Sequence, residues 1–266
     1  MNKIIIVVML FFSTALNAQI IKFEELGKYS RFGILVGGAL YEKAKIKPEF
    51  GDITFKNIPI PSYNFGFEYD FYPKNNWSII TAFNWALEPA FNLEAPCFTK
   101  DSLSSHMEKE RSIYYFEDTF FSFSIPIFLA FREKMSNQRF LEFRMGIKLM
   151  YFSHGHYGTV DIDELSSDDK YSTFLLSTRN TNTLANIYGS FIFGAGVNIL
   201  TNWSLIKINM FCNINFQNPI EGEYLFYNLP ISKRNSGKYY LSGDYLGLNV
   251  VFHLNRDIFK RKSKKG

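Results

Sequence analysis

The chain has 266 residues, of which 47% are hydrophobic and 20% charged, and its 29 Phe and 16 Tyr give a high aromatic content. This composition is too apolar for an intrinsically disordered protein and too evenly charged for a helical membrane protein. The long continuous apolar run Ile4–Phe12 is shorter than the roughly 20 residues that a membrane-spanning helix needs. Helical transporters, coiled coils and acidic linkers are therefore excluded.

The formal net charge of +4 comes from the C-terminal end, where residues 256–266 hold six basic residues and one acidic residue. The basic character belongs to a short tail, residues 255–266, and not to the fold, so we expect no nucleic-acid partner. We expect the tail to be periplasmic, either solvated or in contact with anionic headgroups. Two cysteines, Cys97 and Cys212, exclude a disulfide scaffold, and the sequence has no Cys/His metal spacing.

Residues 1–18 have the pattern of an export signal. Lys3 precedes the apolar run Ile4–Phe12, and the small residue Ala18 stands directly before Gln19. We expect cleavage after Ala18, which leaves residues 19–29 as an N-terminal periplasmic segment. A hydrophobic strand or an uncleaved anchor is the alternative interpretation.

Downstream of residue 29, apolar and polar residues alternate with a period of two, which predicts strands whose two faces meet different surroundings. Each alternating segment is long enough to cross a bilayer at a tilt, which takes about 9–11 residues. The eight segments are Ser30–Tyr41, Ser62–Tyr72, Trp77–Leu87, Phe120–Arg132, Phe140–Phe152, Ile187–Leu200, Ser204–Gln217 and Tyr240–Leu254.

The connections between these segments are of two kinds that alternate strictly along the chain. The short ones are Pro73–Asn76, Glu133–Arg139 and Thr201–Asn202. The long ones are Glu42–Pro61, Glu88–Thr119, Ser153–Asn186 and Asn218–Tyr239. Up-and-down strands would place every long connection on one side, as in outer-membrane barrels with long external loops and tight periplasmic turns. The pattern predicts an all-β fold, an eight-stranded antiparallel up-and-down transmembrane β-barrel over residues 30–254.

A soluble eight-stranded barrel of the lipocalin kind is the rival interpretation, because alternation alone does not say which face points outward. Three features favour a membrane barrel over a soluble one. The apolar face is rich in aromatic residues, the opposite face carries Gly, Asn and charges of both signs, and four long connections at one rim would be unusual for a soluble barrel. A membrane barrel must also be closed, since lipid tolerates no unpaired sheet edge.

Two stretches resemble a known family. The segment Phe123–Arg132 with the following Phe143–Lys148 resembles a strand and hairpin of small Bacteroidota-type outer-membrane barrels, and Tyr245–Val250 resembles their closing strand. The resemblance implies an OmpA-like transmembrane barrel in the bacterial outer membrane, in a family that includes barrels associated with protein secretion. The chain departs from the pattern in having no following peptidoglycan-binding domain and in placing a basic tail after the last strand. Pro126 inside a predicted strand cannot donate to the ladder, so we expect a bulge or kink there.

Charged residues on the polar faces of the predicted strands would point into the barrel. An eight-stranded interior is just wide enough for side chains to fill, and buried charges must be paired. We therefore expect a salt-bridged plug, with a proton or ion path as the alternative, and no general porin. The predicted interior cluster is Arg31, Glu68, Asp70, Arg132, Glu142, Arg144, Lys148 and Lys207.

Three further sites are candidates. His154 and His156 share a side near the start of a long connection rich in acidic residues, which makes a metal site conceivable; a solvated acidic loop is the alternative. Ser153 beside these histidines raises the possibility of a lipid A-modifying enzyme, although no family motif matches. Trp77, Trp85 and Trp203 are predicted anchors at the membrane interfaces.

We expect a non-enzymatic outer-membrane barrel without a cofactor, acting as a scaffold or binding through its external loops. Long connections on a rigid scaffold often carry binding, and Glu88–Thr119 and Asn218–Tyr239 mix aromatic with charged residues, which suits a protein or glycan ligand. The alternative is that their aromatic residues extend the strands above the bilayer. The expected partners are otherwise outer-membrane lipid and lipopolysaccharide, and the expected state is a monomer. The alternatives are a lipid A-modifying barrel enzyme and an accessory barrel of a secretion system.

Overall fold

The computed structural model describes residues 21–51, 54–57, 61–97, 112–152, 157–162, 173–180, 186–227 and 235–256. The predicted signal segment 1–18, most of the basic tail and the candidate residues Ser153, His154 and His156 lie outside the described residues. No helix in the described part of the chain is long and apolar enough to cross a membrane.

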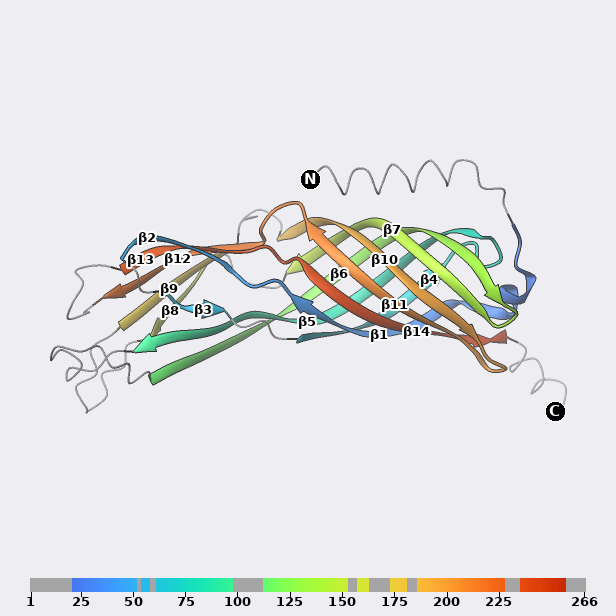
Figure 1. Ribbon diagram of the computed structural model, residues 1–266, viewed down its shortest axis with the longest axis horizontal. Coiled ribbons are helices and arrows are strands. Elements are labelled where there is room, and N and C mark those ends of the chain that lie inside the picture. Colours follow the sequence, from blue (N-terminus) through green and yellow to red (C-terminus); the bar gives the residue numbers. More distant parts are fainter. Residues whose placement is uncertain are drawn as a thin grey trace.

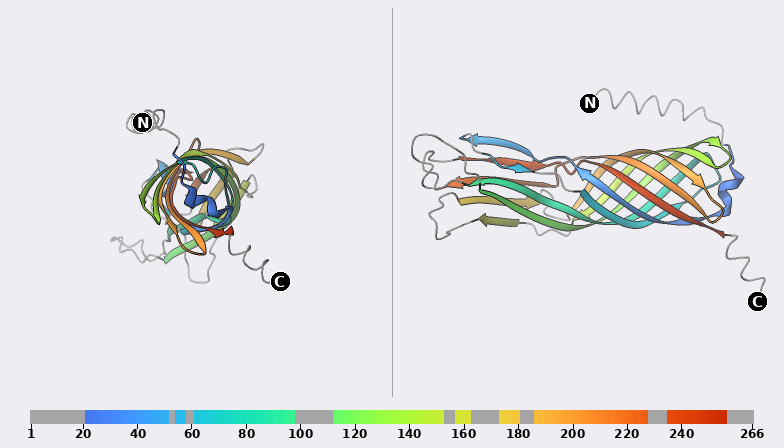
Figure 2. Two further views of the ribbon diagram at one scale, coloured as in Figure 1. Left: turned by 90° about the vertical axis from the view of Figure 1, so that its right-hand side faces the viewer. Right: turned by 60° about the horizontal axis from the view of Figure 1, so that its bottom comes forward.

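Eight antiparallel strands close into a barrel (Figures 1 and 2). Each strand pairs with the next in chain order, and the last pairs with the first, which leaves the barrel wall without an open edge. This confirms the predicted fold. The strands are β1 (Tyr29–Tyr41), β4 (Pro61–Asp70), β5 (Trp77–Cys97), β6 (Ser112–Ser136), β7 (Arg139–Phe152), β10 (Ile187–Leu200), β11 (Ser204–Asn215) and β14 (Tyr245–Asn255).

The register of the eight pairs fixes the tilt of the strands. Following paired residues from strand to strand once around the barrel, from Phe152 on β7 through Ser122 on β6, returns to β7 at Glu142. The end point lies ten residues before the starting point, and this offset is the stagger of the barrel. Such a stagger requires strands inclined by about 35–45° to the barrel axis and gives an interior that side chains can fill.

Residues from the predicted long connections form a further sheet beyond one rim of the barrel, at the left in Figure 1. Five strands pair in the order β2–β13–β12–β9–β8, and β3 (Lys56–Asn57) pairs with the far part of β5. We call this part, together with the ends of β5 and β6 beyond the barrel, the extension. Its other strands are β2 (Lys45–Phe50), β8 (Tyr157–Ile162), β9 (Thr173–Asn180), β12 (Ile220–Tyr227) and β13 (Asn235–Leu241).

Two predicted boundaries are wrong for reasons that the extension explains. The predicted strand ends at Leu87 and Phe120 are too early, because β5 and β6 continue pairing as far as Cys97 and Ser112; this is the alternative expected for residues 88–119, an extension of the strands. The predicted strand Tyr240–Leu254 is broken at Gly243, which has a φ of 68° and would bring a Cβ to 2.3 Å from the Asn215 amide. The break sends β13 into the extension and starts β14 in the barrel.

The opposite rim carries only tight turns and a short 3-10 helix, η1 (Glu24–Lys28), at the right in Figure 1. The turn between β6 and β7 is shorter than predicted, because β6 continues to Ser136. Viewed from this end, η1 lies across the mouth of the barrel (Figure 2, left).

The two faces of the strands have opposite character. The outward face is exposed and apolar, as at Phe65 on β4 and Ile147 on β7, whereas the alternate positions are buried and mostly polar or small. Pro126 does not produce the expected bulge. The ladder with β5 lacks pairs between Ile127 and Ser124, but its register is the same on both sides, so the strand loses hydrogen bonds without an inserted residue.

Candidate functional site in the barrel interior

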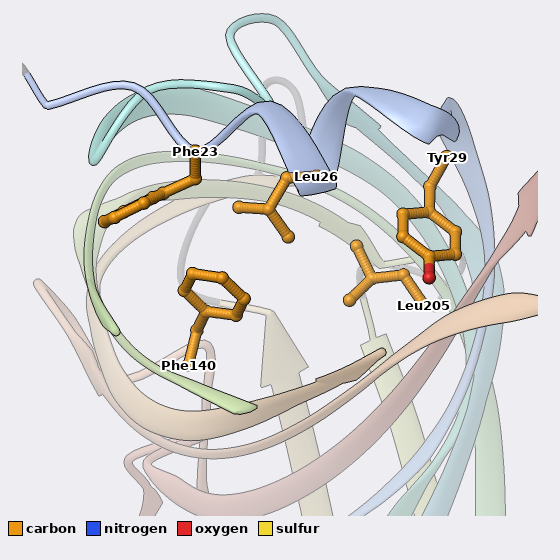
Figure 3. Close-up of a cluster of buried hydrophobic side chains, with 5 residues drawn as sticks. All are labelled: Phe23, Leu26, Tyr29, Phe140 and Leu205. Atoms are coloured by element: carbon orange, nitrogen blue, oxygen red, sulfur yellow. The ribbon is translucent and has the colours of Figure 1, made fainter. Parts of the chain in front are cut away.

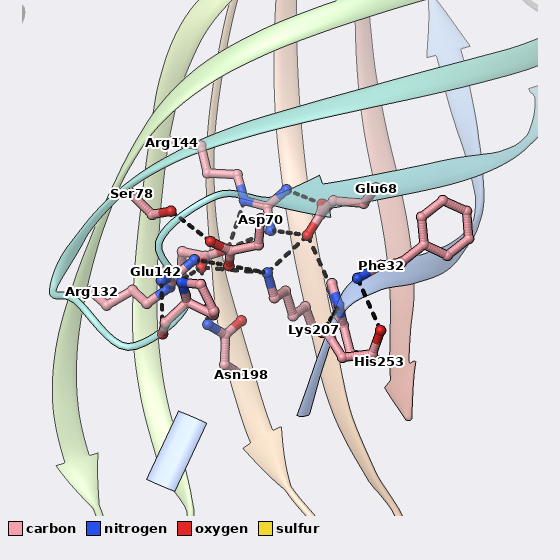
Figure 4. A network of polar contacts seen from close by, with 12 residues as sticks. Phe32, Glu68, Asp70, Ser78, Arg132, Glu142, Arg144, Asn198, Lys207 and His253 are labelled. Carbon is pink, nitrogen blue, oxygen red and sulfur yellow. Dashed lines mark hydrogen bonds and ion pairs between the residues drawn. The ribbon is translucent and has the colours of Figure 1, made fainter. Parts of the chain in front are cut away.

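Six charged side chains meet inside the barrel near the short-turn rim (Figure 4). They come from four strands, and each is at most 3% exposed. The alternation of the strands explains their convergence, because every one occupies an inward position at a similar height. The six are Glu68 and Asp70 on β4, Arg132 on β6, Glu142 and Arg144 on β7, and Lys207 on β11.

Arg144 is the centre of this charge cluster. Its guanidinium donates to both carboxylate oxygens of Glu68, at 2.5 and 3.2 Å, and its Nε donates to Glu142 Oε1 at 2.6 Å. The guanidinium carbon also lies 5.7 and 5.8 Å from the ring centroids of Phe128 and Phe211. Arg144 therefore joins two carboxylates and stacks on an apolar layer, a combination that suits a planar guanidinium.

Arg132 and Lys207 complete the network. Arg132 pairs with Asp70 and donates from Nε to Glu142 Oε2 at 2.6 Å. Lys207 Nζ donates to Glu68 Oε1 at 2.8 Å and to Asp70 Oδ2 at 3.2 Å. Three carboxylates face three cations, so the cluster is electrically balanced, which is the condition for tolerating buried charge.

Sequence reasoning missed one member and misplaced two. His253 on β14 lies 3.3 Å from Glu68 Oε1 through Nε2, and its Nδ1 lies 2.9 Å from the Ser30 carbonyl oxygen. Continuing the alternation of β14 from Gly247 would have found it. Arg31 is exposed and outside the cluster, because an irregularity in β1 between Tyr29 and Gly33 shifts the pairing with β14. Lys148 is buried in the interior but separate from the cluster.

Between the charge cluster and the rim with the short turns, a cluster of apolar side chains closes the barrel (Figure 3). Leu26 of η1 is 1% exposed and packs with Phe23, Tyr29, Phe140 and Leu205. The Phe23 and Phe140 rings are 5.0 Å apart, and the Tyr29 hydroxyl donates to the Thr201 carbonyl oxygen at 2.7 Å. These contacts attach η1 to β7, to β11 and to the turn before β11, so the helix seals this end of the interior.

Ion pairs at the rim hold η1 in place. Lys74 donates to Glu24 at 2.6 Å, and Lys134 pairs with Glu25. The hydrogen bond and charge of Lys74 lower the pKa of Glu24, and those of Lys134 lower the pKa of Glu25.

The three tryptophans lie on the outside of the barrel at two heights. Trp77, at the start of β5, is half-buried beside Phe131 with the ring centroids 4.8 Å apart, and Trp203 is exposed in the turn before β11. Trp85, eight residues further along β5, is exposed and stacks on Phe123 at 6.2 Å. Two of these rings therefore mark the short-turn rim, and the third lies towards the extension.

The described residues contain no group of three or more His, Cys, Asp or Glu side chains arranged to hold a metal ion. The predicted metal residues His154 and His156 are outside the described residues. Cys212 is a free, half-buried cysteine on β11.

The fold and its surfaces define a class: a closed barrel with an apolar exterior, a charged interior and long excursions at one rim, the architecture of outer-membrane β-barrels. No family model matches the chain, and no curated protein sequence matches it. Solved structures with a similar fold include the outer membrane protein OprG from Pseudomonas aeruginosa, with 9% identity and a TM-score of 0.43 over 85% of this chain and 96% of OprG. Ail, the attachment invasion locus protein of Yersinia pestis, is 12% identical, with a TM-score of 0.28 over 82% of this chain and 97% of Ail.

Proposed function

We propose that this chain is a non-enzymatic, integral β-barrel of a bacterial outer membrane that presents the extension at the cell surface for binding. The observation that carries the proposal is the inverted distribution of polarity, with carboxylates and guanidinium groups inside and aromatic and aliphatic side chains outside. In water this arrangement would expose a continuous apolar band, which soluble monomers avoid. In a bilayer the same band meets acyl chains, and the closed wall satisfies the backbone polar groups.

The positions of the aromatic side chains support the same orientation. Trp77 and Trp203 at the short-turn rim and Trp85 towards the extension stand where interfacial aromatic girdles are found in barrels of this kind. Short turns face the periplasm in such proteins, so η1 would be periplasmic and the extension external.

The extension has its own cluster of buried aromatic side chains. Phe55 packs edge-on against Tyr224 and Tyr239, with ring centroids 5.2 and 5.8 Å away, and Tyr239 is fully buried. On its surface, Lys47 lies over the ring of Tyr240 at 5.1 Å, as an exposed pairing of charge and aromatic ring. Aromatic and charged side chains exposed on the strands of a sheet are suited to binding a protein or a glycan.

Partition between detergent and buffer tests the membrane assignment. The mature polypeptide should stay in the membrane fraction after an alkaline carbonate wash and should require detergent to remain folded and dispersed. A folded, monomeric polypeptide in plain buffer would contradict the proposal, because it would mean that the apolar face is not the outer one.

Cysteine labelling of intact cells tests the orientation. In a background with Cys97 and Cys212 replaced by Ser, a membrane-impermeant maleimide should label Lys47→Cys on β2 of the extension. It should not label the matched variant Gln138→Cys, in the exposed β6–β7 turn, until the outer membrane is permeabilised. The reverse pattern would show that the extension is periplasmic.

A further inference from the structure

Among the described residues, the half of the barrel interior that faces the extension is polar and has one buried charged side chain, Lys148. Three inward residues on adjacent strands are neighbours in this region: Asn84 on β5 pairs directly with Ser124 on β6, and Pro126, two residues further along β6, pairs with Lys148 on β7. Diagonal neighbours on one face of a sheet lie within reach of a long side chain. We call Asn84, Ser124 and Lys148 the upper interior site.

Lys148 has no acidic partner among the described residues, although it is only 2% exposed. Its Nζ lies 3.3 Å from the Tyr245 hydroxyl oxygen, 3.7 Å from the Met150 sulfur and 4.6 Å from the centroid of the Tyr245 ring. The charge cluster below is balanced without it, so Lys148 leaves the described interior with one uncompensated positive charge. Buried charges are normally paired, since desolvation makes an isolated one costly.

The other two residues of the upper interior site have unused hydrogen-bonding groups. The buried Oδ1 of Asn84 has no partner, and neither the Asn84 amide nor the Ser124 hydroxyl makes a hydrogen bond within the described part of the chain. Both side chains keep 8–9% of their surface exposed although they point inward. Neighbouring side chains therefore do not cover these two residues completely, and polar surface is left for a small guest.

We propose that Asn84, Ser124 and Lys148 bind a small monovalent anion, a halide or a carboxylate, inside the upper half of the barrel. The ammonium group would supply the compensating charge, and the hydroxyl would donate a hydrogen bond. The amide would donate through Nδ2, since the oxygen and nitrogen of an Asn amide exchange places on rotation about χ2. The anion enters from the side of the extension, because η1 and the charge cluster close the other end.

Thermal unfolding of the full mature protein in detergent micelles tests this site. Bromide, formate and gluconate are compared as sodium salts at equal ionic strength. Gluconate, a carboxylate with a six-carbon chain, is the reference because it is too large for a small-anion site in the barrel interior. Bromide or formate should raise the melting temperature above that in gluconate, because a ligand that binds only the folded state stabilises it. A response to formate alone identifies a carboxylate site, and a response to both identifies a general small-anion site. Equal melting temperatures in all three salts would overturn the proposal.

Variants separate the site from general salt effects. Lys148→Met should reduce the apparent anion affinity by about tenfold or more, the loss expected when a hydrogen bond to a charged group is removed. The matched control Lys43→Met, at an exposed cation beyond the end of β1, should keep the full anion response. If Lys148→Met retains the response, the proposal fails.

Two further tests do not depend on the folding of Lys148→Met. Ser124→Val and Asn84→Leu keep the lysine but remove the donors and the space, and each should abolish the anion response. Diffraction from crystals grown in bromide should show an anomalous peak beside Lys148 Nζ, and a peak elsewhere only would refute the site. These measurements address the interior alone, so they are independent of the membrane in which the barrel resides.

Discussion

Removing the guanidinium of Arg144 should destabilise the barrel strongly, and removing one of its carboxylate partners as well should restore much of the loss. Arg144→Met leaves Glu68 with Lys207 and His253 and leaves Glu142 with Arg132, so three carboxylates face two cations. Breaking a buried ion pair by removing one partner costs about 3–5 kcal/mol, because the remaining charge is buried without compensation.

The double variant Arg144→Met/Glu68→Gln has two carboxylates, Asp70 and Glu142, and two cations, Arg132 and Lys207, so the cluster is again balanced. We expect it to be more stable than Arg144→Met alone by about 2 kcal/mol, because the uncompensated carboxylate charge is gone. Methionine fills most of the volume of the arginine stem, and it keeps contact with Phe128 and Phe211.

The assay is urea unfolding of the mature protein in detergent micelles, followed by tryptophan fluorescence. The control is Lys134→Met, which breaks the partly exposed rim pair with Glu25 and should cost at most about 1 kcal/mol. If the destabilisations of Arg144→Met and Glu68→Gln simply add in the double variant, charge balance does not govern the stability of the cluster.

Three other predictions follow from the same structure. Ile147→Lys, on the exposed face of β7 near mid-height, should cost about 2–4 kcal/mol in lipid vesicles, as for lysine at the bilayer midplane, whereas Trp203→Lys at the rim should cost about 1 kcal/mol or less; equal costs would contradict the membrane position. The pKa values of Glu24 and Glu25 are lowered in the folded state, so their stabilisation of η1 is complete above the ordinary carboxyl pKa and is lost as the pH falls through the lowered values. The hydrogen-exchange protection of η1, corrected for the intrinsic pH dependence of amide exchange, should therefore fall in acid, and Glu24→Gln/Glu25→Gln should remove that dependence; pH-independent protection in the wild type would refute it. Replacing Ser153, His154 and His156 by Ala should leave lipid A unchanged by mass spectrometry, and an altered profile would show that the protein is an enzyme.

The period-two pattern predicted the barrel and its two faces because a strand's sidedness is a local property. Glu68 and Asp70 alternate with Phe67 and Tyr69, and that spacing alone places the two carboxylates together inside the barrel. Arg31 follows the same parity as Leu35, but it lies in the irregular stretch before Gly33 and is exposed. No residue type in that stretch indicates the irregularity.

The extension could not be predicted in the same way. Its strands are short, and they pair with partners far away in sequence, as β2 does with β13. Alternation over a few residues such as Lys45–Phe50 does not distinguish a paired strand from a solvated loop. The upper interior site could not be predicted from the sequence either, because only the strand register shows that Lys148 lies away from the carboxylates.

The length of β6 carries this strand well beyond the wall of the barrel. Its last pair with β7 is at Ser122, so residues 112–121 run on beyond the barrel wall, where, within the described part of the chain, they pair with β5 alone. At about 3.3 Å per residue, this stretch covers roughly 33 Å, comparable to the hydrocarbon thickness of a bilayer. Because β6 runs without a break from the barrel wall into the projection, we expect a force or contact at the distal tip to be transmitted along this strand to the barrel.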